Sequence, residues 1–171
     1  FLAQNVLLVG IAFTVLLGTT FPLLSEAVRG TKLSIQAPFF NTITAPMGYA
    51  LLLLMGVGML ISWRKSSWEG LQRNFQNPVI LATVGTIFLS WLLYEKNIQW
   101  EVYITFWAAI FVTSIILFEL AKTSYIKSRQ TGTNFLMGLF YAISSNRRRY
   151  GGFLIHFGAV LMFLGFAGTF F

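Results

Sequence analysis

Five long apolar stretches alternate with shorter polar loops along the chain. A helix that crosses a bilayer needs about 20 mostly apolar residues, and each of these stretches is close to that length. The pattern therefore predicts transmembrane helices near residues 5–24, 45–63, 78–94, 100–121 and 151–171. We expect Pro46 and Pro78 to stand in the first turn of their helices, where a missing backbone N–H costs little.

A sixth apolar stretch, at residues 135–143, is too short to cross a bilayer. It predicts a short helix, because apolar side chains recur at helical spacing on one face. Two positions for this helix are open. It lies in the interface of the cytoplasmic leaflet, or it is a cytosolic extension packed against the other helices. The side chains on the apolar face are Phe135, Leu136, Leu139, Phe140 and Ile143.

Composition sets the protein class. Of the 171 residues, 56% are hydrophobic and only 10% are charged, whereas a soluble domain carries about 25% charged residues. We therefore predict an all-α integral membrane helical bundle, a single multi-span region over residues 1–171 with about five transmembrane helices and one short interfacial helix. The chain has no cysteine, which excludes disulfides, thiolate zinc sites and iron–sulfur clusters within it.

The net charge of +7 is distributed as a topology signal. Loops 64–77 and 122–150 hold nine of the 12 basic residues, and loops 25–44 and 95–99 hold three. By the positive-inside rule, the first two loops are cytoplasmic, and the end of the chain faces the opposite side. Basic residues beside apolar stretches indicate contact with anionic lipids. No soluble basic domain is present that would bind nucleic acid.

His156 is the only histidine and lies inside the last apolar stretch. It stands about five residues into that span, or about 7 Å along the helix. Ionisable side chains in membrane spans are functional candidates, and imidazole is a common metal ligand. Small and aromatic neighbours on its face, Gly152 and Phe153 among them, suit the edge of a haem, whose iron takes an axial histidine. A hydrogen bond to a neighbouring helix and a proton-relay role are the alternatives.

The charged residues offer little other chemistry. Glu119 is expected to form a solvated pair with Lys122, three residues further along the same helix. The triplet Arg147, Arg148 and Arg149 is a topology and lipid-headgroup anchor, or it attracts an anionic group such as a haem propionate. The sequence contains no aspartate, and no paired-carboxylate site, catalytic triad or phosphate-binding glycine loop can be assembled.

Three motifs in the chain resemble those of the CcmF proteins. The first is a tyrosine, a glycine pair and then His-x-Gly opening a membrane helix. The second is an asparagine followed by apolar residues and by a Leu-Gly-Thr-x-x-Pro sequence. The third resembles the family's "PPYFN" loop, with Ala37 in place of one proline. The motifs lie at residues 149–158, at Asn5 to Leu8 with 17–23, and at 33–41.

The resemblance implies a function in cytochrome c maturation. CcmF proteins are membrane subunits of a haem lyase that joins haem to the CxxCH cysteines of apocytochrome c. Haem arrives from the chaperone CcmE, and partner subunits present the apoprotein. The family also carries haem b between two membrane histidines, which takes electrons from quinol. One of those ligands maps onto His156. The implied location is the inner membrane of bacteria or of mitochondria.

The chain departs from the family in ways that limit this implication. The tryptophan-rich haem loop, the two external histidines and the second membrane histidine are absent from it. The chain begins with Phe1 rather than Met and ends at Phe171 within an apolar run. We interpret it as a later-middle part of a longer protein that does not attach haem alone.

Two rival functions remain open. One is a transporter or channel segment with His156 on a polar path, and the other is a non-catalytic membrane scaffold. The hydroxyls that would line such a path are those of Thr14, Thr19, Thr83, Thr86, Thr105, Thr113 and Ser114.

Overall fold

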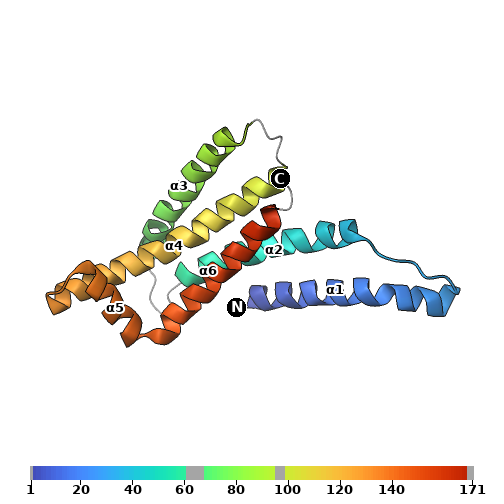
Figure 1. The fold of residues 1–171 in the computed structure, drawn as a ribbon, viewed down its shortest axis with the longest axis horizontal. Coiled ribbons are helices and arrows are strands. Elements are labelled where there is room, and N and C mark those ends of the chain that lie inside the picture. Colours follow the sequence, from blue (N-terminus) through green and yellow to red (C-terminus); the bar gives the residue numbers. More distant parts are fainter. Residues whose placement is uncertain (1, 61–67, 95–98, 169–171) are drawn as a thin grey trace. The chain divides into compact units, whose positions relative to one another are not determined.

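The computed structural model describes residues 2–60, 68–94 and 99–168, and within these ranges every regular element is an α-helix (Figure 1). The all-α prediction is confirmed. All helices except α5 are long and apolar enough to cross a membrane, so the chain is an integral membrane protein. The helices are α1 (Leu2–Arg29), α2 (Ala37–Leu60), α3 (Trp68–Leu92), α4 (Trp100–Thr131), α5 (Phe135–Ser145) and α6 (Arg147–Gly168).

The prediction that two prolines open their helices is wrong. Pro46 lies inside α2 and Pro78 inside α3, and both helices begin about two and a half turns earlier. Each proline removes one backbone hydrogen bond, that to the carbonyl four residues before it. Membrane helices tolerate this loss because local adjustments and neighbouring groups satisfy the freed carbonyl. The residues before each proline therefore continue the helix.

The chain forms two compact units, residues 1–58 and 59–171. In the first, α1 and α2 meet through long side chains of α2 that lie over glycines of α1. The side chain of Phe40 covers Gly18 so closely that a Cβ there would overlap the ring. The Ser25 hydroxyl accepts a hydrogen bond of 2.9 Å from the Leu33 backbone N–H, which ties the connecting segment to the end of α1.

Helix α4 is the centre of the second unit, because α3, α5 and α6 all pack against it. Its Val112 and Ile115 are fully buried. On the side of α3, the Trp107 and Phe111 rings stack with centroids 5.3 Å apart. The Trp107 indole N–H donates a hydrogen bond of 3.2 Å to the Thr83 hydroxyl of α3. These contacts fix α3 along one side of α4.

Helix α4 extends past the length that a bilayer requires. Its 32 residues span about 48 Å, against a hydrocarbon core of about 30 Å. It ends at Gly132, whose φ of 66° places it in the left-handed region that favours glycine. The chain then reverses, and α5 packs back against α4.

The structure of α5 has a feature of each of the two positions that the sequence left open, an interfacial helix and an extension packed against the other helices. Gly138 lies against the backbone of α4, and the Ser124 hydroxyl of α4 donates a 2.6 Å hydrogen bond to the Phe135 carbonyl. The opposite face of α5 is apolar and exposed, with Leu136 and Phe140 at 76% and 65%. One face of α5 is therefore packed, and the other has the character of a lipid-facing surface. Its position in the membrane interface stays a prediction.

Candidate functional site

His156 lies on the packed face of α6. Its neighbours on this face are spaced by four and three residues alternately, which keeps them on one side of a helix. Val160 and Ala167 of this set are almost fully buried, at 1% and 4% exposure. The imidazole thus projects from the side of α6 that is covered by protein. The set is Arg149, Phe153, His156, Val160, Phe163 and Ala167.

The imidazole of His156 has an unsatisfied nitrogen. Its Nδ1 atom is buried and has no hydrogen-bond partner among the residues that the structure describes. Buried polar side-chain atoms in proteins nearly always have a partner. The hydrogen bond to a neighbouring helix that the sequence left open as an alternative is therefore not present within residues 2–60, 68–94 and 99–168. An imidazole in this state fits a group that needs a nitrogen ligand.

The side chains next to His156 on α6 are small or aromatic. Gly152 lies one turn earlier on the same side of α6, and a Cβ built on it would meet nothing within 4 Å. Phe153 and Phe163 stand half-buried on the same face. Small and aromatic side chains of this kind permit close approach and stacking of a ring system. These residue types suit a flat ring system, and haem at His156 stays a prediction.

The described residues contain no cluster of three or more His, Cys, Asp or Glu side chains able to hold a metal ion. A metal with several protein ligands from this part of the chain is therefore not supported. Haem iron is different, because the porphyrin supplies four nitrogens and the protein supplies only axial ligands.

Arg149 pairs with an acidic residue of the neighbouring helix. Its Nη2 lies 2.5 Å from Oε2 of Glu119 on α4, and its guanidinium lies 5.6 Å from the centroid of the Phe153 ring. The expected pairing of Glu119 with Lys122 is wrong as a description of the structure. The packing of α6 on α4 presents Arg149 to the carboxylate, and no local sequence pattern signals this contact.

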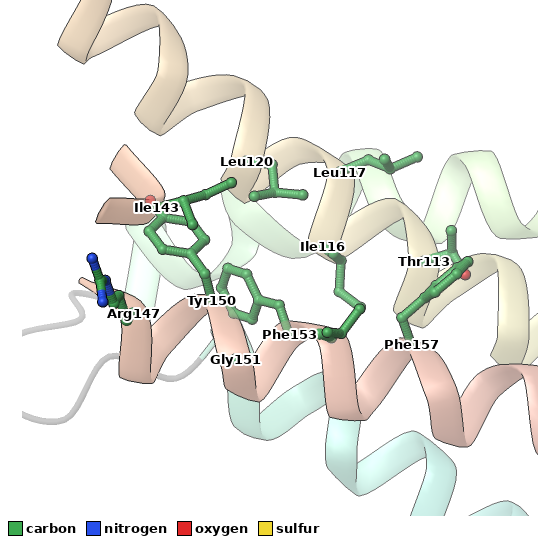
Figure 2. A pocket seen from close by; sticks show the side chains of 11 residues that line it. Thr113, Ile116, Leu117, Leu120, Ile143, Arg147, Tyr150, Gly151, Phe153 and Phe157 are labelled. Carbon is green, nitrogen blue, oxygen red and sulfur yellow. The ribbon is translucent and has the colours of Figure 1, made fainter. Parts of the chain in front are cut away.

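Arg147, unlike Arg149, lies at a groove between α4 and α6 (Figure 2). The groove has a volume of about 560 Å³ and an almost entirely apolar lining. Tyr150, Phe153 and Phe157 of α6 point toward α4 across it (Figure 2). Neither His156 nor Arg148 lines this groove. Arg147 and Arg149 thus have different surroundings, which their closeness in sequence does not predict.

Comparison with known proteins identifies the family. No protein-family model matches the chain, and no solved structure matches it. It is 31% identical over 165 residues to the cytochrome c-type biogenesis protein CcmF of Pseudomonas fluorescens, covering 96% of this chain and 23% of that protein. It is 34% identical over 137 residues to CcmF of Escherichia coli K12, covering 78% of this chain and 20% of that protein.

A third relative, CcmF of Haemophilus influenzae, is 25% identical over 166 residues, which is 97% of this chain and 24% of that protein. The chain thus spans less than a quarter of the length of each of these relatives. The matches to the Pseudomonas fluorescens and Haemophilus influenzae proteins cover 96% and 97% of the chain, so they include the segment that holds His156. The chain therefore belongs to the CcmF family of cytochrome c-type biogenesis proteins, of which it corresponds to a partial segment.

Proposed function

We propose that this chain is part of a membrane haem lyase that attaches haem to apocytochrome c, and that His156 is one axial ligand of haem b. The observation that carries this proposal is the buried, unpartnered Nδ1 of His156 on the packed face of a membrane-length helix. Membership of a cytochrome c biogenesis family gives the imidazole a chemical purpose, in which Nε2 would bind the iron and Nδ1 would donate its N–H to an acceptor outside these residues. A second axial ligand comes from outside these residues, since the chain has no other histidine.

The residues of α6 have separate roles in this proposal. His156 supplies a nitrogen lone pair to the iron, and Gly152 keeps the adjacent helix surface open for the porphyrin. Bound haem supplies a one-electron carrier within the bilayer. The aromatic ring of Phe163, half-buried on the same face, helps to exclude water from the ligand nitrogen.

Among the three arginines, Arg149 is the candidate partner for a haem propionate. It lies seven residues before His156, which is about 10 Å along the helix and on the same side. Its guanidinium has five N–H donors, and the contact with Glu119 uses only Nη2. Arg147 projects from the opposite side of the helix and Arg148 from an intermediate direction, so neither is assigned to the propionates.

The wider process involves partners that this chain does not contain. We propose that haem comes from the chaperone CcmE, that other subunits present apocytochrome c, and that quinol reduces the haem in the inner membrane of bacteria or mitochondria. Thioether formation adds a cysteine S–H across a haem vinyl group. No residue of this chain is assigned to that step, which we place on the side of the membrane that holds loop 25–44.

Transport along a polar path is less well supported. Six of the seven hydroxyls that would line such a path donate to a backbone carbonyl three or four residues earlier in their own helix. Their donors are therefore already used, and the helices present few free polar groups to a solute. The six are Thr14, Thr19, Thr83, Thr86, Thr105 and Ser114.

The proposal is tested by optical spectroscopy of the full-length parent protein in detergent. We expect His156→Ala to remove most of the reduced b-type absorbance. We expect His156→Gly to recover it when imidazole is added, because free imidazole can occupy the vacated position. Leu161→Ala, on the exposed side of α6, is the control and should keep full haem content. Unchanged absorbance in His156→Ala would refute the assignment.

A further inference from the structure

The groove between α4 and α6 combines an apolar interior with a cationic end. Thr113, Leu117 and Leu120 of α4 form one wall, and Tyr150 and Phe157 are part of the other. None of its lining residues is acidic. A groove of this kind accepts a ligand with a long apolar part and a negative group.

The dimensions of the groove match one leaflet of a membrane. Along α6 it extends from Arg147 to Phe157, which is ten residues or about 15 Å. The hydrocarbon core of a bilayer is about 30 Å thick, so the groove is as long as the acyl region of a single leaflet. A lipid chain lying along α6 would therefore fill it with its polar end at Arg147.

The charge at this end is uncompensated. Within residues 2–60, 68–94 and 99–168, the Arg147 side chain forms neither an ion pair nor a hydrogen bond. Glu119, an acidic side chain of the adjoining helix, is paired with Arg149. A guanidinium recognises phosphate oxygens through two parallel hydrogen bonds. The charge balance of the chain also places this end in the cytoplasmic leaflet, which is rich in anionic lipids.

From these observations, we propose that the α4–α6 groove is a binding site for an anionic phospholipid of the cytoplasmic leaflet. One acyl chain lies between the two helices, and the headgroup phosphate pairs with Arg147. This site is separate from His156, which does not line the groove. The bound lipid fills the space between α4 and α6 and so supports the position of the helix that carries the histidine.

Native mass spectrometry of the full-length parent protein tests this site, with phosphatidylglycerol and phosphatidylcholine as the two probes. We expect the wild type to retain phosphatidylglycerol more strongly than phosphatidylcholine. Arg147→Gln should weaken phosphatidylglycerol retention by about tenfold, since a charge-assisted hydrogen bond is lost. Arg148→Gln removes the same charge outside the groove and should change retention by less than about threefold, because an unpaired exposed charge is screened.

A second variant tests the apolar part without changing charge. Gly151 lines the groove, and a Cβ there would meet nothing within 4 Å, so Gly151→Leu should fold and reduce retention of both lipids. Gly158→Leu, where a Cβ is equally free but outside the groove, should not. Equal losses in Arg147→Gln and Arg148→Gln would show general charge attraction and overturn the proposal. Lipid retention that Gly151→Leu leaves unchanged would indicate that another helix of the parent protein fills the groove.

Discussion

Glu119 of α4 and Arg149 of α6 form an ion pair of 2.5 Å between residues that are 30 positions apart in sequence. The carboxylate is 22% exposed and the guanidinium 46%. The pair sits seven residues before His156 on the same side of α6. It therefore marks the register in which α6 packs along α4, on the side of α6 from which the imidazole projects.

Removing this pair should loosen α6 more than any change at Lys122. We expect Arg149→Gln and Glu119→Gln each to cost about 1 kcal/mol, in the range of partly exposed pairs. The double variant should cost little more than either single variant, because the interaction is lost only once. Thermal unfolding of the parent protein in detergent provides the measurement.

Lys122→Gln is the matched control for this cycle. Lys122 lies three residues from Glu119 and was the partner expected from sequence, yet it is Arg149 that the structure places on the carboxylate. We expect Glu119 and Lys122 to show no coupling in a second double-variant cycle. Coupling to Lys122 instead of Arg149 would contradict the packing of α6 on α4.

The sequence predicted what depends on local hydropathy. Each long apolar stretch became a membrane-length helix, and residues 135–143 became the short helix α5. The starts of α2 and α3 were predicted too late in the chain, because both helices begin well before Pro46 and Pro78. A membrane helix tolerates the hydrogen bond that a proline removes, and hydropathy does not measure that free-energy cost. Helix length was underestimated most clearly for α4, whose polar last turns lie outside any apolar window.

Contacts between helices account for the rest of what the sequence could not predict. Only neighbours within one helix are visible in a sequence, and this is why Lys122 was expected beside Glu119. The groove at Arg147 exists only because α4 and α6 pack together. The face of His156 was easier to predict, since helical spacing from position 156 already placed Phe153 on the same side of α6.

Replacing Gly138 should disrupt the packing of α5 on α4. A Cβ at this position would lie 2.5 Å from the Ser124 carbonyl oxygen and 2.8 Å from the Ser128 backbone nitrogen. Backbone atoms cannot move aside as a side chain can, so α5 must shift. We expect Gly138→Ala to cost about 1–3 kcal/mol, measured by thermal unfolding and by faster proteolysis near Gly132.

Gly165→Ala is the control for Gly138→Ala. Nothing lies within 4 Å of a Cβ at Gly165, and alanine has a higher helix propensity than glycine. Its stability should be equal to or slightly above that of the wild type. If Gly138→Ala behaves in the same way, α5 does not pack on α4 as closely as described.

The identity of the ligand at position 156 should set the redox potential of the proposed haem. Methionine is a weaker donor to ferric iron than imidazole, and His/Met ligation raises the potential relative to two histidines. We expect His156→Met to keep part of the haem and to shift its midpoint potential upward in a spectroelectrochemical titration. A variant that retains haem at the wild-type potential would mean that the iron takes its ligand elsewhere.

The orientation of the spans gives a test that is independent of haem. Nine of the 12 basic residues lie in the segments 64–77 and 122–150, and the positive-inside rule predicts that these segments are cytoplasmic. Alkaline phosphatase, which is active only outside the cytoplasm, should be active when fused after Phe171 and inactive when fused after Gly132. A green fluorescent protein fused at the same two sites should give the opposite pattern. The reverse result would place Arg147 in the outer leaflet and remove the cytoplasmic lipid from the proposed groove.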